Sequence, residues 1–167
     1  VSEASKHKVH IAKSKSGIVV KGIDDIAVRF SRCCNPVPGD EIVGFVTRGR
    51  GVSIHRTDCV NIINLPEDER SRMIDAEWQM AEGASNNEQY STEIKIFANN
   101  RIGMFADISK VFTEKQIDIT SMNVRTSKQG KATIIMTFDI HGMEELGRLT
   151  DKIRQIEGVL DIERTAG

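Results

Sequence analysis

Apolar and polar residues alternate in three stretches of the first half of the chain, a pattern typical of β-strands with one buried face. These stretches lie at 17–34, 41–56 and 73–80. The turn formers of NPVPGD at 35–40 and the glycines of RGRG at 48–51 divide them into separate strands. A short helix is predicted after the second stretch, with Thr57 or Asp58 as its N-cap. The first half therefore reads as a small, strand-rich unit.

The second half of the chain shows both the strand and the helix pattern of apolar residues. Apolar residues recur every second position in the expected strands and every third or fourth position in the expected helices. The predicted order is strand 92–98, helix 104–115, strand 117–126, strand 131–140, helix 146–156 and strand 159–164. The apolar parity of the second strand switches between Ile119 and Met122, which predicts a bulge or an edge position. The βαββαβ order predicts a ferredoxin-like fold of the α+β class, with both helices covering one face of the sheet.

A polar segment without apolar anchors divides the chain at residues 82–89. We therefore expect a tail at 1–17, a small mixed α/β domain at 18–81, and a βαββαβ domain at 90–167. The tail is polar and mildly basic. Because it does not begin with Met, we interpret the chain as a fragment that starts in a linker of a longer protein.

Composition supports two units with different partners. Hydrophobic residues make up 39% of the 167 positions and aromatic residues only 5%, so the cores must be aliphatic. The net charge of -1 conceals an asymmetry, because residues 1–66 hold ten Lys and Arg against six Asp and Glu, whereas residues 67–167 hold thirteen against eighteen.

No apolar run is long enough to cross a membrane, and no signal peptide is visible. Three cysteines, an odd number within 27 residues, argue against a secreted disulfide framework, so a cytoplasmic location is expected.

Those cysteines and one histidine form the main candidate for chemistry. The four residues are Cys33, Cys34, His55 and Cys59. They are the ligand types that structural zinc prefers. Neighbouring residues on a strand point to opposite faces, so both members of the Cys-Cys pair can bind one ion only if the backbone kinks, which the following Asn35-Pro36 could provide. A small core of buried cysteines is the competing interpretation. Cys–His catalysis and a redox pair of adjacent cysteines are disfavoured.

The stretch RFSRCCNPVPGDEIVGFVTRGRGVSIHRTDCVNI, at residues 29–62, resembles a small module of long Rel/SpoT-type enzymes. These enzymes make and break the alarmone (p)ppGpp in the stringent response. The module is called the zinc-finger or ribosome-intersubunit domain, and in the family it precedes an ACT domain, a regulatory βαββαβ unit. The resemblance covers roughly residues 18–165. It implies that the four Cys and His residues are ligands of a structural Zn²⁺, and that the ribosome (rRNA) and tRNA are partners of the full-length protein.

The resemblance also implies an RNA-binding surface on the first domain. The basic residues that could form it are Lys21, Arg29, Arg32, Arg48, Arg50 and Arg56. Arg48 and Arg50 flank Gly49 in a tight turn, which would present both side chains outward to phosphates or to a folded RNA surface. An ordinary solvated turn is the alternative. No aromatic residues interleave these arginines, so base stacking is not indicated.

In amino-acid-binding ACT domains the ligand lies at a dimer interface, between the loop before the first helix and the second strand of a neighbour. By resemblance, these positions are Asn100, Arg101, Ile102, Gly103 and Met104 on the loop, and Asp118, Ile119 and Thr120 across it. Two departures weaken the match, because Ile102 replaces a frequent proline and Asp118 a frequent asparagine. Branched-chain amino acids are the candidate ligands, and a homodimer through the ACT domain is expected. Local core and loop packing is the alternative.

The chain carries no recognisable catalytic set, since RGRG lacks the lysine and hydroxyl of a phosphate-binding P-loop. We therefore expect a non-catalytic regulatory fragment of a (p)ppGpp synthetase/hydrolase. It would sense the state of the ribosome and relay that signal to catalytic domains of the same protein. Amino acids are a second candidate signal. The alternatives are a free-standing amino-acid-sensing ACT protein with a zinc module, and a generic RNA-binding adaptor.

Overall fold

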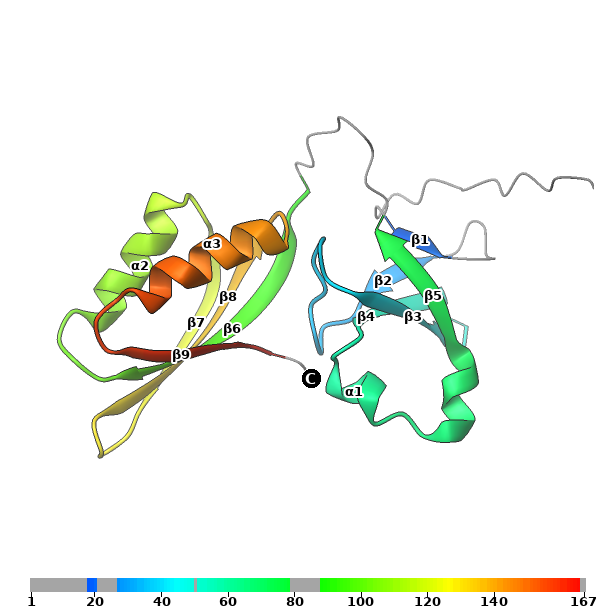
Figure 1. Cartoon of the computed structure of the whole chain (residues 1–167), viewed down its shortest axis with the longest axis horizontal. Helices are drawn as coiled ribbons and strands as arrows, with labels where there is room; N and C mark the ends of the chain where they lie inside the picture. The colour runs from blue at the N-terminus through cyan, green and yellow to red at the C-terminus, as the bar shows by residue number, and fades with distance from the viewer. Residues whose placement is uncertain (1–17, 21–26, 50, 79–87, 166–167) are drawn as a thin grey trace, which may run out of the picture.

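The computed structural model describes residues 18–20, 27–49, 51–78 and 88–165 of the chain. Figure 1 shows two units side by side, one built on strands β1 to β5 and the other on β6 to β9 with helices α2 and α3. The last strand, β9, runs back toward the first unit, so its end at Arg164 lies beside that unit. The predicted tail 1–17 and most of the predicted linker 82–89 lie outside the described residues.

The first unit is a five-stranded sheet in the order β1-β5-β3-β4-β2. Its strands are β1 (Ile18–Val20), β2 (Val28–Phe30), β3 (Ile42–Thr47), β4 (Gly51–Arg56) and β5 (Met73–Trp78). The pairs are antiparallel except for β2 with β4, which is parallel. The turn predicted at 48–51 joins β3 to β4, where Gly49 has a φ of 77° that glycine adopts without strain. One face of the sheet buries the aliphatic residues Ile18, Val20, Val52, Ile54 and Ala76.

Two short helical segments connect β4 to β5. They are helix α1 (Val60–Ile63) and a 3-10 helix (Glu67–Arg72). The predicted N-cap of α1 is wrong, because Cys59 occupies that position and no side chain caps the helix. The carboxylate of Asp58, which could have capped it, instead binds Arg56, with Nε to Oδ1 at 2.9 Å.

The second unit has the predicted βαββαβ order and ferredoxin-like topology. Its elements are β6 (Tyr90–Asn99), α2 (Met104–Glu114), β7 (Ile119–Thr126), β8 (Lys131–Ile140), α3 (Met143–Arg154) and β9 (Val159–Arg164). The sheet order is β7-β8-β6-β9, and both helices cover one face (Figure 1). The pairing of β7 with β8 shifts register between Ile119 and Ser121, which confirms the predicted bulge. None of the helices in the described part of the chain is both long and apolar enough to span a membrane.

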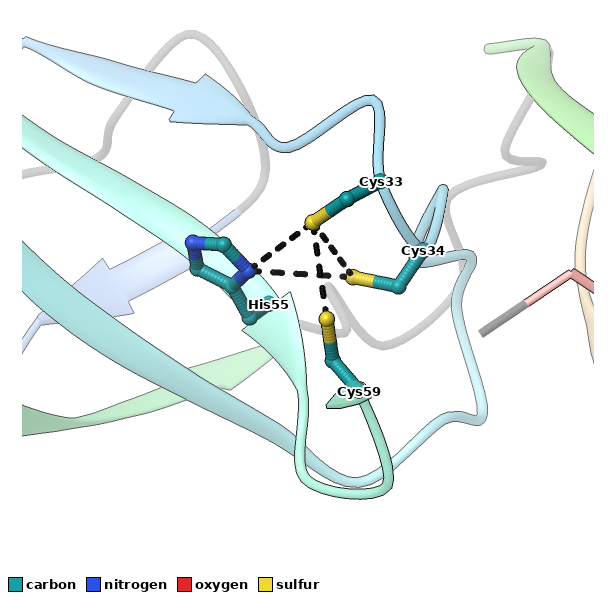
Figure 2. A group of neighbouring side chains, drawn as sticks. All are labelled: Cys33, Cys34, His55 and Cys59. Atoms are coloured by element: carbon teal, nitrogen blue, oxygen red, sulfur yellow. Dashed lines mark hydrogen bonds between the residues drawn. The ribbon is translucent and has the colours of Figure 1, made fainter. Parts of the chain in front are cut away.

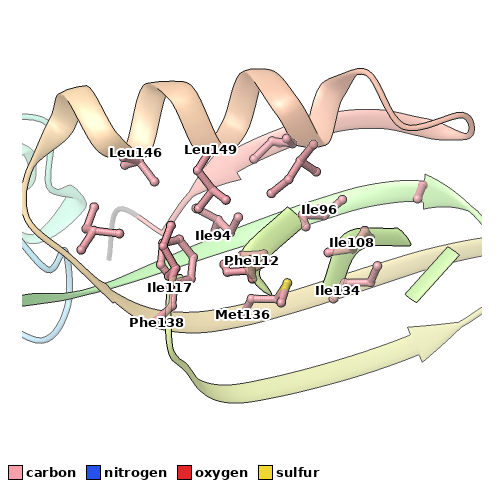
Figure 3. Close-up of a cluster of buried hydrophobic side chains, with 14 of the residues drawn as sticks. Ile94, Ile96, Ile108, Phe112, Ile117, Ile134, Met136, Phe138, Leu146 and Leu149 are labelled. Carbon is pink, nitrogen blue, oxygen red and sulfur yellow. The ribbon is translucent and has the colours of Figure 1, made fainter. Parts of the chain in front are cut away.

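The core of the second unit follows from the two periodicities (Figure 3). The strands contribute every second residue, including Ile94 and Ile96 on β6 and Phe138 on β8, all fully buried. The helices contribute Ile108, Phe112, Leu149 and Ile153, among others. Burying an Ile, Leu or Phe side chain contributes about 1.5–3 kcal/mol each. This layer anchors the start of β6, the start of α3 and the end of β9, which all contact the first unit.

Candidate metal centre

The structure brings Cys33, Cys34, His55 and Cys59 together, as the sequence predicted (Figure 2). Their ligand atoms all lie within 4.8 Å of one another. Cys33 and Cys34 lie in the turn after β2, His55 on β4, and Cys59 directly before α1. Residues 32–34 form a turn in which the Asn35 N–H donates to the Ser31 carbonyl at 3.0 Å, so the pair leaves the extended geometry that would point its side chains to opposite faces. Asn35 then adopts a positive φ of 47°. The expected kink after the Cys-Cys pair is therefore present.

Four of the six distances among the ligand atoms are close to those around one tetrahedral ion. Tetrahedral zinc with Zn–S bonds of about 2.3 Å places its sulfurs about 3.8 Å apart, and sulfur and nitrogen about 3.6 Å apart. The Cys33 Sγ lies 4.0 Å from Cys34 Sγ and 3.4 Å from Cys59 Sγ. The Nδ1 of His55 lies 3.4 Å from Cys33 Sγ and 3.9 Å from Cys34 Sγ. The residues present therefore fit a structural zinc ion, which would crosslink the turn after β2, β4 and the start of α1.

The imidazole of His55 is held in the orientation that a metal ligand needs. Its Nε2 lies 3.1 Å from the hydroxyl of Ser53, and that hydroxyl donates to the carbonyl of Phe45 at 3.4 Å. A Ser53 hydroxyl that donates to Phe45 is left to accept from His55, and in the tautomer that donates through Nε2 the Nδ1 lone pair faces the sulfurs. Such hydrogen bonds from outside the ligand set fix the tautomer of a metal-binding histidine. Burial also lowers the pKa of His55, so the ring is neutral at pH 7.

The thiols differ in how readily they ionise. Burial raises the pKa of Cys34 to about 12, although the backbone N–H of Arg56 donates to its sulfur at 3.3 Å. Burial likewise raises the pKa of Cys59. Burial also opposes ionisation of Cys33, but hydrogen bonds with Ser31, Asn61 and the other two cysteines outweigh it and lower its pKa. Without a metal, the pKa of one thiol in the cluster is therefore lowered and the pKa values of the other two are raised. A divalent cation would favour the ionised form of all three, because it binds thiolates.

Zinc binding should therefore release at least two protons per ion. Cys34 and Cys59, whose pKa values are raised, must lose their protons to bind, whereas neutral His55 contributes none. Lowering the pH by one unit near neutrality should weaken the affinity about 100-fold or more, because each displaced proton contributes a factor of about ten. Competition with a chromophoric zinc chelator at pH values of about 7 and 8 measures this. An affinity that does not change with pH would contradict thiolate ligation.

Two supporting residues escaped the sequence analysis. Ser31 Oγ lies 2.8 Å from Cys33 Sγ, and Ser53 orients His55. Each serine stands two positions before the ligand that it contacts. Residues two apart on a strand share a face, so this spacing was an available signal for Ser53 and His55 on β4. It was not one for Ser31, because Cys33 lies in a turn.

Of the basic residues predicted to contact RNA, three lie exposed in the described part of the chain: Arg29, Arg32 and Arg48. Arg29 pairs in register with Ser53, so it shares the face of the sheet that carries His55 and the cluster. Lys21 and Arg50 lie outside the described residues.

The sixth predicted RNA contact, Arg56, does not belong to this surface. It is 6% exposed. Its guanidinium binds Asp58 and donates to the carbonyls of Cys34 at 3.2 Å and Thr165 at 3.1 Å. On β4 its side chain shares the buried face with Val52 and Ile54, opposite to His55. Arg56 therefore connects parts of the chain rather than presenting a charge to RNA.

The predicted amino-acid site is split within one chain. Asn100 to Gly103 precede α2 and Met104 begins it, whereas Asp118 to Thr120 follow it. The 11 residues of α2 separate the two groups by about 16 Å, given a rise of 1.5 Å per residue. Arg101 is bound to Asp107 and to the Glu157 carbonyl, Met104 is buried, and Ile102 is fully exposed. Only two copies of the chain could join the two groups, as in the predicted dimer, and the amino-acid site stays a prediction.

Comparisons with known proteins match both units. Residues 18–79 match the RelA/SpoT RIS domain family, and residues 86–164 match an ACT domain family. The chain is 37% identical to a GTP pyrophosphokinase of Escherichia coli over 157 residues, which are 93% of the chain and 21% of that protein. It is 39% identical to a GTP pyrophosphokinase of Streptomyces coelicolor over 153 residues, 92% of the chain and 18% of that protein. A crystal structure of the ACT domain from GTP pyrophosphokinase of Chlorobium tepidum covers 46% of the chain and 99% of its own length, at 25% identity and a TM-score of 0.42.

Fold, cluster and family matches together define a two-domain unit in which a RIS domain precedes an ACT domain. The chain belongs to the Rel/SpoT family and spans about a fifth of the length of the GTP pyrophosphokinases that it matches.

Proposed function

We propose that this chain is a non-catalytic regulatory region of a (p)ppGpp synthetase/hydrolase that acts in the stringent response. The observation that carries the proposal is its alignment over 93% of its length with a GTP pyrophosphokinase, of which it spans only 21%. It would bind the ribosome through its RIS domain and relay ribosome and tRNA state to catalytic domains of the same protein. The four-residue cluster would hold a structural zinc ion that fixes the shape of the RIS domain.

The exposed arginines support an electrostatic contact with ribosomal RNA. Arg29 lies on the face of the cluster, and Arg48 lies on the β3–β4 turn. The Phe45 ring on the same face as Arg29 is covered by the guanidinium of Arg72, 4.8 Å from its centroid, so this face presents positive charge rather than a bare aromatic ring. Such a surface suits the phosphates and folded shape of RNA better than unpaired bases.

Replacing Arg48 with glutamate should weaken binding of the chain to intact ribosomes. A lost phosphate contact reduces the slope of log affinity against log salt by about one, and the reversed charge should lower affinity about ten-fold or more at low salt. Co-sedimentation at several salt concentrations measures both effects. Arg148→Glu is the matched control, because Arg148 is also exposed but lies on α3 of the ACT domain. Equal losses in both variants, or no ribosome binding by the parent chain, would favour the free-standing ACT sensor.

A further inference from the structure

The turn of residues 35–40, which directly follows the Cys-Cys pair, is docked on the ACT domain. Val37 is fully buried and belongs to the ACT core rather than to the core of its own domain. The backbone N–H of Met143, at the start of α3, donates to the Pro38 carbonyl at 2.8 Å. A Cβ at Gly39 would lie 2.8 Å from Cβ of Met143, so the two backbones approach as closely as glycine allows.

A buried ion pair fastens the same turn to the end of β9. Arg164 binds the Asp40 carboxylate through two nitrogens, at 2.6 Å and 3.0 Å, and both side chains are largely buried. Arg164 also donates to the Asn35 carbonyl at 3.1 Å. A buried bidentate pair has a defined geometry, and separating its partners leaves two buried charges uncompensated. Any domain arrangement that moves β9 away from the turn would lose this contact.

A second connection runs through β4. His55 and Arg56 are consecutive, so their side chains point to opposite faces of the sheet. His55 faces the cluster, whereas Arg56 reaches the Thr165 carbonyl beyond β9. Arg56 also holds Cys34 twice, because its backbone N–H donates to the sulfur and its guanidinium to the carbonyl. The atoms that shape the cluster and the atoms that dock the ACT domain therefore belong to the same few residues.

From this sharing we infer that metal occupancy of the cluster and docking of the ACT domain on the 35–40 turn are energetically coupled. An ion bound by Cys33 and Cys34 would fix the backbone that leads into the turn. It would thereby support the left-handed conformation of Asn35, the first residue of the turn, whose carbonyl Arg164 binds. Loss of the ion removes that constraint on the backbone, and the ACT domain then undocks from the turn. The inference rests on the zinc site of the proposed function, but it adds a mechanical consequence, since the ACT domain position reports the state of the cluster.

The chain contains its own reporter of docking. Trp78, its single tryptophan, donates through Nε1 to the Asp40 carbonyl at 3.1 Å. Its ring stacks on Phe30 of the RIS domain, and Tyr90 of the ACT domain meets it edge-on, both with centroids 5.6 Å apart. Undocking of the ACT domain removes Tyr90 from this ring, so the emission of Trp78 and its accessibility to acrylamide should both change.

The first measurement titrates Zn²⁺ into the reduced, metal-free chain. Zinc uptake is followed with a competing chromophoric chelator, and Trp78 is followed by emission and acrylamide quenching. We expect quenching to fall and to saturate at one ion per chain. Zinc uptake with unchanged Trp78 would overturn the coupling alone, whereas absence of zinc uptake would overturn both the coupling and the zinc site. Ribosome binding, measured separately, tests the rest of the proposed function.

The second measurement uses reciprocity, because a coupling between two events must act in both directions. Arg164→Gln, which weakens docking from the ACT side, should lower zinc affinity about five-fold or more. Arg148→Gln, which removes an exposed arginine from the same domain, should leave it unchanged. Circular dichroism checks that the ACT domain stays folded in both variants. Equal zinc affinities in Arg164→Gln and the parent chain would overturn the coupling, even if Trp78 responds to zinc through the RIS domain alone.

Discussion

Replacing Cys59 with serine should abolish tight zinc binding and remove the stability that the ion gives to the RIS domain. Cys59 is fully buried, and its sulfur lies 3.4 Å from that of Cys33. A serine hydroxyl is a poor substitute for a thiolate at a zinc site. Zinc at about 1,000 times its Kd stabilises the native state by about 4 kcal/mol, and the variant should lose about that amount. Denaturant unfolding with and without saturating zinc, together with metal analysis, measures the loss.

The same experiment separates a metal site from a small core of cysteines. If zinc holds the domain, Cys59→Ser should cost less than about 1.5 kcal/mol in the metal-free chain, and a chelator should destabilise only the parent. If the cysteines simply pack as small hydrophobes, the variant should be destabilised equally with and without zinc, and the chelator should have no effect. The second result would refute the zinc site.

The ACT half could be predicted from the sequence because its information is local. Each strand and helix buries one face against a single core, so the alternation around Ile94 and Ile134 and the helical spacing from Met104 to Phe112 specify the elements directly. Even the bulge near Ile119 was visible as a change of parity. The order βαββαβ then leaves few ways to pair the strands, and the observed sheet is the expected one.

The RIS half was less accessible because its strands are short and their partners are not encoded locally. The pattern predicted β2 and β4 but not that they pair in parallel, since alternation fixes which face is buried and not which strand lies alongside. Arg56 was misplaced for a related reason, because arginine alone suggests a surface. Its parity with Val52 and Ile54 was the contrary signal, and it indicated the buried face.

The four residues of the candidate cluster could be predicted from the sequence, but their contacts with the rest of the chain could not. The residue types of Cys33, Cys34, His55 and Cys59 define a ligand set in any fold that brings them together. The contacts that give this set a further role, between Asp40 and Arg164, join positions 124 residues apart. No local pattern predicts such a pair, because either residue alone resembles an ordinary surface charge.

Replacing Gly51 with alanine should destabilise the RIS domain far more than the same change at Gly49, although both glycines lie in one hairpin turn. Both have a positive φ, of 85° and 77°, so each substitution carries a backbone cost of about 1–2 kcal/mol. A Cβ at Gly51 would lie 2.2 Å from the carbonyl oxygen of Ala27, whereas a Cβ at Gly49 meets nothing within 4 Å. We expect Gly51→Ala to cost about 3 kcal/mol or more, with Gly49→Ala as the matched control at about 1 kcal/mol.

The crowded position also bears on the metal centre. The Ala27 carbonyl accepts from the N–H of Val52 at 2.9 Å and so begins the parallel pairing of β2 with β4. Pushing Ala27 away shifts β2, which leads within three residues to Cys33. Gly51→Ala should therefore weaken zinc binding, and Gly49→Ala should not, although neither residue is a ligand. Urea unfolding of the metal-free variants and chelator competition measure the two effects, and equal behaviour of the two glycine variants would show that the β2–β4 pairing does not position the cluster.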